Sequence, residues 1–202
     1  LKGKMRTGDN IGVGWDPRDP RGDFTSAVVS GVCKAGANAL ILGIVPTPLV
    51  PMYMLYKNAL AGFMVTASHN PKDQNGIKTF CSFRGLKPLP ENDVALTRAI
   101  LKVNPLTLSK LPIKGKLIDS RKEALNLFYQ FSLEPENTWV PSEQINQLFK
   151  NIILVIDAAN GSLSTIAAET FRQAGFGKVI EINAKLNGDV NLKSGVADLE
   201  GE

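Results

Sequence analysis

Short apolar runs alternate with amphipathic segments along the first half of the chain. The apolar runs have the length of buried strands, and they comprise residues 10–16, 38–45 and 61–67. Between the first two runs, apolar side chains recur at helical spacing. Asp23 is the expected N-cap of this helix and Gly36 its expected stop. A second helix is expected to begin near Pro51.

A fourth strand, at 76–80, is expected after a turn at Asn75-Gly76. Strands that alternate with helices imply a mainly parallel sheet, because parallel neighbours need a crossover. We therefore predict an α/β fold with a mixed, mainly parallel sheet flanked by helices. Ligands of such sheets bind outside the carboxyl ends of the strands. The loops at 15–22, 45–48 and 66–71 should converge there.

The strand and helix pattern restarts in the second half. Before the restart we expect a helix over 91–103, an irregular connector over 104–115 and a helix over 121–131. Ser120 and Glu123 have the spacing of a capping box that opens the last of these helices. A βαβ unit then follows, with a strand at 151–157, a helix at 163–175 and a strand at 178–183. We therefore predict one domain over 1–118 and an incomplete second domain over 119–202.

Composition narrows the class of protein without naming a function. The 44% hydrophobic and 21% charged content is typical of a folded, soluble chain. The net charge of +4 is spread among acids, which argues against a nucleic-acid partner. Cys33 and Cys81 form no paired motif, so we expect no zinc site and a cytoplasmic location. No apolar run reaches the roughly 20 residues of a membrane helix, so no membrane partner is expected.

Candidate chemistry lies in the stretch "TASHNPKDQNGIK", residues 66–78. Ser68 follows an apolar strand, beside His69 and Asn70, and Lys78 returns on the next strand. Such donors around a hydroxyl suit a phosphoryl group carried on that hydroxyl. An ordinary turn is the alternative, because serine and asparagine favour turns. A serine–histidine hydrolase fits less well, since Ser68 and His69 are adjacent and no G-x-S-x-G segment is present.

The same stretch resembles the phosphoserine loop of the α-D-phosphohexomutase family. That family includes phosphoglucomutases, phosphomannomutases and phosphoglucosamine mutases. "VGWDPR" is similar to the family's strand ending in Asp-x-Arg, and "ILGIVPTPLV" to its Gly-x-x-x-Thr-Pro segment. "VIDAANGSLSTIAAETF" resembles the opening of its second domain. The resemblance covers residues 11–80 and 151–201.

The resemblance implies a role for each residue of the candidate site. Ser68 would carry the phosphoryl group and exchange it with a hexose phosphate, moving phosphate between C1 and C6 through a bisphosphorylated sugar. Lys78 and His69 would transfer protons and hold phosphoryl oxygens, and Asn70 would shape the turn. Arg18 would add a cation at the same edge of the sheet.

Two of these residues also have plainer interpretations. Arg18 has Asp19 and Asp23 near it in sequence, either of which could pair with it in a surface salt bridge. Lys78 could be a solvated strand residue.

Cofactors and partners are likewise implied by the resemblance. Magnesium would bind between the phosphate on Ser68 and a three-aspartate loop that this sequence does not contain. Ser68 is therefore the one metal ligand that can be named, through its phosphate. Glucose 1,6-bisphosphate or a similar sugar would act as activator, and a hexose monophosphate would be the substrate partner.

The chain also departs from the family pattern. A Gly-Ile-Arg-Gly-like strand and two further domains are missing, so we expect this chain alone to be inactive. We expect the parent protein to be a phosphomannomutase/phosphoglucomutase. The alternatives are a phosphoglucosamine mutase, which "GDVNLKSG" resembles, and a non-catalytic homologue that binds a sugar phosphate or a protein partner.

Overall fold

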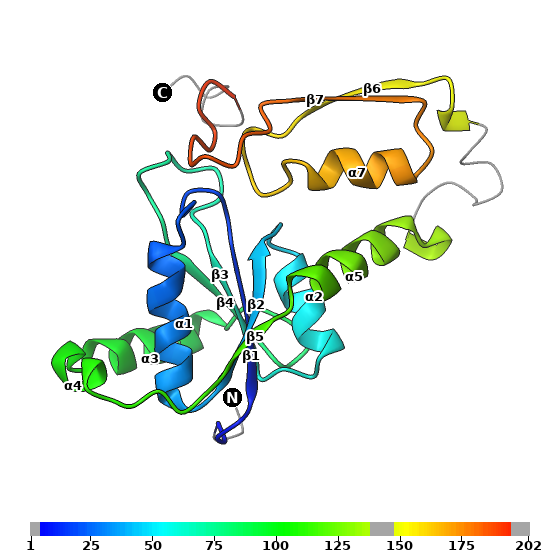
Figure 1. Cartoon of the computed structure of the whole chain (residues 1–202). Coiled ribbons are helices and arrows are strands. Elements are labelled where there is room, and N and C mark those ends of the chain that lie inside the picture. The colour runs from blue at the N-terminus through cyan, green and yellow to red at the C-terminus, as the bar shows by residue number, and fades with distance from the viewer. Residues whose placement is uncertain (1–4, 138–147, 195–202) are drawn as a thin grey trace.

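The computed structural model describes residues 5–137 and 148–194 (Figure 1). The first sheet contains β1 (Asn10–Trp15), β2 (Asn38–Ile44), β3 (Ala61–Val65), β4 (Ile77–Cys81) and β5 (Leu117–Asp119). Its helices are α1 (Asp23–Ala35), α2 (Leu49–Tyr56), α3 (Pro90–Leu101), α4 (Pro105–Ser109) and α5 (Arg121–Leu133), and a 3₁₀ turn covers Pro135–Asn137. The second sheet contains β6 (Ile153–Asp157) and β7 (Lys178–Ile182), joined through α7 (Ile166–Gln173).

The strand order of the first sheet is β4-β3-β1-β2-β5. All neighbours are parallel except β3 and β4, so the predicted mixed, mainly parallel sheet is confirmed. β1 lies between β2 and β3, and the crossover helices α1 and α2 pack on opposite faces. The chain goes from β1 to β2 on one side and from β3 to β4 on the other. The loops after β1 and β3 therefore flank a topological switch point, where open α/β sheets bind ligands.

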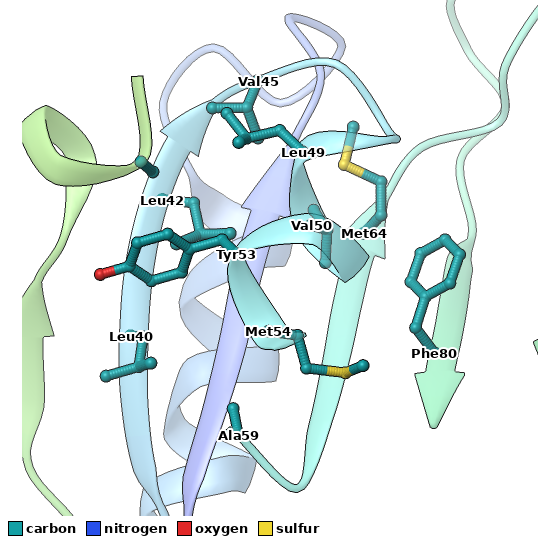
Figure 2. Packing of buried hydrophobic residues seen from close by; sticks show 11 residues of the cluster. Leu40, Leu42, Val45, Leu49, Val50, Tyr53, Met54, Ala59, Met64 and Phe80 are labelled. Atoms are coloured by element: carbon teal, nitrogen blue, oxygen red, sulfur yellow. The ribbon is translucent and has the colours of Figure 1, made fainter. Parts of the chain in front are cut away.

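Alternate residues of the central strands fill two separate cores. Ile11 and Val13 of β1 pack toward α1. Leu40 and Leu42 of β2 pack toward α2 and α5, as Figure 2 shows for α2. Two glycines bring α2 close to the sheet. A Cβ on Gly14 would lie 2.9 Å from Val50 Cγ2, and one on Gly62 would lie 2.8 Å from Val50 Cγ1.

The first helix begins and ends at glycines. Gly36 is the left-handed stop that the sequence predicts, with φ of 99°. The predicted cap at Asp23 is wrong, because Gly22, with φ of 74°, occupies the N-cap position. The carboxylate of Asp23 instead pairs with Arg21 at 2.7 Å. The second helix begins at Leu49, two residues before the predicted start.

The segment before α5 differs from the prediction in two respects. The predicted irregular connector contains the short helix α4 and is followed by a strand, β5, which pairs with β2. The predicted capping box does not form, since Ser120 makes no side-chain cap bond. The carboxylate of Glu123 accepts hydrogen bonds from Tyr53 and Lys57 of the α2 region instead.

The second βαβ unit is confirmed as parallel strands joined through a helix. Helix α5 contributes the fully buried Ala124 to the core of the first sheet and also contacts α7. The position of the domain boundary near residue 118 stays a prediction. No helix within 5–137 or 148–194 is long and apolar enough to span a membrane.

Candidate functional site

The loops that follow β1 and β3 are joined at the carboxyl edge of the sheet. The backbone N–H of Asp16 donates to Val65 O at 3.1 Å. Thr66 Oγ1 donates to Asp16 Oδ2 at 2.6 Å. The predicted convergence of these two loops is confirmed. In the loop after β2, the backbone N–H of Val45 donates to Trp15 O of β1, and Leu49 packs into the core.

Arg18 is buried at this junction, and its partner is Asp16. The guanidinium and the carboxylate form an ion pair in which the side chains are 1% and 5% exposed. The backbone N–H of Arg18 donates to the same carboxylate at 3.0 Å. Neither Asp19 nor Asp23 pairs with it, since Asp19 accepts bonds from Thr25 and Asp23 lies against Arg21. The surface salt bridge considered from the sequence is therefore excluded.

The second terminal nitrogen of Arg18 holds the loop that follows β3. Nη2 donates to Ser68 O at 2.6 Å and also to Asn70 O. A planar guanidinium can bond an anion and two carbonyls at once because its donors are fixed in a fork. Arg18 thus fixes the backbone on both sides of His69, which is the geometry of a positioning residue.

Ser68 lies in the loop with a left-handed backbone, at φ of 60°. A non-glycine residue is uncommon in this region, and such conformations cluster at active sites and switches. Its N–H donates to Thr66 Oγ1 at 3.0 Å. The side chain is exposed, and its hydroxyl has no hydrogen-bond partner within the described residues. The Ser68 oxygen is therefore accessible to a ligand.

His69 and Asn70 differ in how they are held. His69 is exposed, and its ring has no partner in the part of the chain that the structure describes. The Asn70 side chain donates to Gln74 Oε1 at 2.6 Å, across the loop. The chain reverses through turns at 68–69 and 72–73, so the predicted Asn-Gly turn is wrong. Gly76 already belongs to the antiparallel ladder, where its carbonyl accepts from the N–H of Thr66.

Lys78 lies on β4, opposite Met64 of β3, and is half-buried. Burial lowers the pKa of its ammonium, and the positive charges of Lys87 and Arg18 lower it further. The negative charge of Asp16 raises the pKa of Lys78 and so opposes this shift. The Lys78 side chain is thus partly withdrawn from solvent, and its role as a proton acceptor stays a prediction. Sequence reasoning missed Lys87, which the turn at Arg84-Gly85 returns alongside β4.

Residues beyond β7 also reach this loop, a contact that the sequence analysis did not predict although "GDVNLKSG" includes them. Lys72 Nζ lies 2.9 Å from Asp189 Oδ1. Asn191 Nδ2 lies 3.4 Å from Ser68 O and 3.3 Å from Asn70 O. No hydrophobic period or spacing signals these contacts, because they join segments more than 100 residues apart in sequence.

A separate surface hollow lies between α2 and α5. Its lining residues are Tyr56, Asp119, Arg121, Lys122, Glu123, Asn126, Leu127 and Gln130. None of them belongs to the loops after β1 and β3. The candidate site at the carboxyl edge of the sheet therefore lies outside this hollow and is defined by its hydrogen bonds and charges.

Comparison with known proteins identifies the family of this chain. A profile of the phosphoglucomutase/phosphomannomutase α/β/α domain I matches residues 1–105, more than half of the chain. The chain belongs to the phosphoglucomutase/phosphomannomutase family. The matched span includes Arg18, Ser68, Lys78 and the whole loop between β3 and β4.

Curated relatives are named as phosphoglucosamine mutases. That of Corynebacterium jeikeium is 32% identical over 185 residues, which cover 91% of this chain and 38% of the relative. That of Pseudomonas aeruginosa (strain UCBPP-PA14) is 35% identical over 190 residues, covering 94% and 40%. The chain thus spans about two fifths of the length of these relatives.

Two solved structures share the fold. A phosphoglucomutase/phosphomannomutase family protein from Burkholderia thailandensis aligns with a TM-score of 0.64 at 21% identity, covering 91% of this chain and 37% of that one. A protein described as a phosphomannomutase from Thermus thermophilus aligns with a TM-score of 0.66 at 22% identity, covering 90% and 38%.

Proposed function

We propose that this chain is the phosphoryl-carrying part of a phosphohexomutase and that Ser68 is the carrier. The observation that supports this most is the state of Ser68 itself. Its hydroxyl is exposed at the switch point, while the carbonyls of Ser68 and Asn70 are fixed by the buried Arg18. Phosphoryl transfer depends mainly on positioning and charge stabilisation, which this arrangement supplies.

The proposed step exchanges one phosphorus–oxygen bond for another. A hexose hydroxyl oxygen bonds to the phosphorus as the bond from phosphorus to Ser68 Oγ breaks, and the departing Ser68 Oγ takes up a proton from the solvent to which it is exposed. The hydroxyl proton passes to a base, and Lys78 is suited to this because its pKa is lowered. His69, exposed beside Ser68, is the second candidate. The reverse step returns the other phosphate of the bisphosphorylated sugar to Ser68, so that phosphate has moved between C1 and C6.

For the substrate, we propose a hexosamine phosphate in place of the mannose or glucose phosphate expected from the sequence. The support is that relatives at 32% and 35% identity carry the name phosphoglucosamine mutase. The stretch "GDVNLKSG", which resembles those enzymes, supplies the residues that contact the Ser68 loop.

Magnesium stays a prediction, and the residues described do not form a site for it by themselves. Within 5–137 and 148–194, no group of three or more His, Cys, Asp or Glu side chains could hold a metal ion. The carboxylate of Asp16, close to the loop, already accepts from Arg18 and Thr66. A phosphate on Ser68 would be the one ligand offered here, so no step is derived through the metal.

The test uses the longest natural protein that contains this chain. It is incubated with glucose 1,6-bisphosphate and with glucosamine 1,6-bisphosphate, and intact mass and peptide mapping then locate the added phosphate. We expect one phosphate on the peptide containing Ser68, its loss in Ser68→Ala and its retention in Ser82→Ala, a change at an exposed serine beyond β4. An unlabelled Ser68 in the unaltered protein would overturn the proposal.

Turnover rates on three substrates test the sugar. We expect glucosamine 6-phosphate to be isomerised faster than glucose 1-phosphate or mannose 1-phosphate. A higher rate on either of the other two sugars would restore the substrate class first expected from the sequence.

A further inference from the structure

Two donors from distant parts of the chain converge on the same pair of carbonyls. Arg18 Nη2 donates to the carbonyls of Ser68 and Asn70 from the loop after β1. Asn191 Nδ2 lies within hydrogen-bonding distance of the same two oxygens, at 3.4 and 3.3 Å. Asn191 follows β7 in the second βαβ unit. The loop carrying Ser68 is thus held from both units.

The segment that carries Asn191 is fixed to its own unit. The backbone N–H of Asn191 donates to Ala159 O at 2.8 Å. The buried side chain of Asn160 donates to Asp189 O at 3.2 Å and accepts from the N–H of Lys185 at 2.9 Å. These bonds join the segment after β7 to the turn after β6, so Asn191 is presented by a structured turn.

Further contacts dock this segment on the loops of the first sheet. Lys72, in the same loop as Ser68, pairs with Asp189 at 2.9 Å. Gly188, with φ of 93°, lies against the loop after β1, and a Cβ there would be 3.5 Å from Pro20. Figure 1 shows the segment after β7, drawn in red, lying over the loops that follow β1 and β3. The docking therefore does not depend on Asn191 alone.

We propose that Asn191 is a positioning residue that fixes the backbone of Ser68 for phosphoryl transfer; this rests on the proposed function. Its amide restrains the carbonyls on either side of His69, and so the left-handed conformation that sets the direction of the Ser68 side chain. In-line transfer is sensitive to small displacements of the reacting group. The second βαβ unit thereby takes part in the chemistry of the first.

Substitution at Asn191 must respect its backbone, because its φ is 62°. Asn191→Gly removes the amide and tolerates this conformation. Lys193→Gly is the matched control, since Lys193 has φ of 53° and its exposed side chain makes no hydrogen bond or ion pair within the described residues. A structural effect of glycine itself would appear in both variants.

The first measurement is amide hydrogen exchange in residues 66–76 of the 202-residue chain, which requires no enzymatic activity. We expect exchange about threefold to tenfold faster in Asn191→Gly, the effect of losing a typical hydrogen bond. Exchange in Lys193→Gly should match the unaltered chain. Equal exchange in all three chains would overturn the role of Asn191 in holding the loop.

The second measurement is kinetic, in the longest natural protein that contains this chain. We expect kcat to fall about tenfold or more in Asn191→Gly with KM little changed, because positioning acts on the transfer step. An unchanged kcat alongside faster loop exchange would overturn the catalytic half of the proposal. If the unaltered protein neither accepts phosphate on Ser68 nor turns over, the proposed function has failed, while hydrogen exchange still decides whether Asn191 holds the loop.

Discussion

The two sheets are built from similarly apolar strands, yet they are buried very differently. The inner residues of β1 and most of β2 are buried, because α1 covers one face of the sheet and α2 and α5 the other. In β6 and β7 every second residue is exposed, including Ile153 at 62% and Val155 at 58%. Within the described residues, α7 is the main element that covers this second sheet. An apolar strand therefore belongs to a core only where a second layer covers it.

The largest expected effect compares one apolar side chain from each sheet. Leu42→Ala should lower the free energy of unfolding by about 2–5 kcal/mol, because Leu42 is 1% exposed and its loss leaves a cavity. Ile153→Ala should change it by less than about 0.5 kcal/mol, since that side chain is already in solvent. Urea titrations of the 202-residue chain measure both, and similar losses would contradict the distinction between the sheets.

A pair of glycine substitutions tests the close approach of α2 to the first sheet. Gly14→Ala should destabilise the chain by about 1–3 kcal/mol, since the new Cβ would lie 2.7 Å from Val45 and 2.9 Å from Val50. Gly31→Ala, in α1 with no atom within 4 Å of the new Cβ, should stabilise it by about 0.5–1 kcal/mol. Thermal unfolding should give shifts of opposite sign, and a harmless Gly14→Ala would show that α2 can move away.

The attachment of α5 to the first sheet depends partly on Tyr53. Its buried hydroxyl donates to Glu123, and burial together with that carboxylate raises the pKa of Tyr53 to about 12. Tyr53→Phe should cost about 0.5–1.5 kcal/mol at pH 8, the usual net value of a hydrogen bond. Because the folded pKa is the higher one, this contribution is complete below pH 10 and is lost as pH rises toward 12. Urea titrations at pH 8 and pH 11 should show the two chains converging, and a constant difference would contradict this.

The sequence allowed prediction of features that are encoded locally. The strands β1 to β4 of the first sheet, the stop at Gly36 and the loop carrying Ser68 follow from short runs of adjacent residues. The partner of Arg18 could not be predicted in this way, because Asp16, Asp19 and Asp23 are all close to it in sequence. That choice depends on Thr66, which joins Asp16 only when a segment 50 residues away returns beside it.

Two further features were beyond sequence reasoning for related physical reasons. β5 has three residues, too few to show a period, and it is a strand only because β2 offers an edge. Asn191 belongs to a stretch without regular structure, and its contact with the Ser68 loop exists only once both units have folded.

The smallest expected effect compares a strand lysine from each sheet. Lys78 is half-buried on β4, whereas Lys178 is exposed on the open β7. Burial and the charge of Lys87 lower the pKa of Lys78, so the unfolded chain binds its proton more readily than the folded one. Stability must then increase as pH rises from the lowered pKa toward the ordinary value of 10.5, and at pH 7 the charge on Lys78 opposes folding.

Lys78→Met should therefore raise the midpoint of thermal unfolding slightly at pH 7, and this gain should shrink by pH 10. Lys178→Met should leave the midpoint nearly unchanged at both values. If Lys78 is the base proposed here, the same substitution also abolishes phosphoryl transfer, so that stability and activity change in opposite directions. A lower midpoint at pH 7 would show that Lys78 stabilises the fold, and its place in the sheet would then no longer favour a catalytic role.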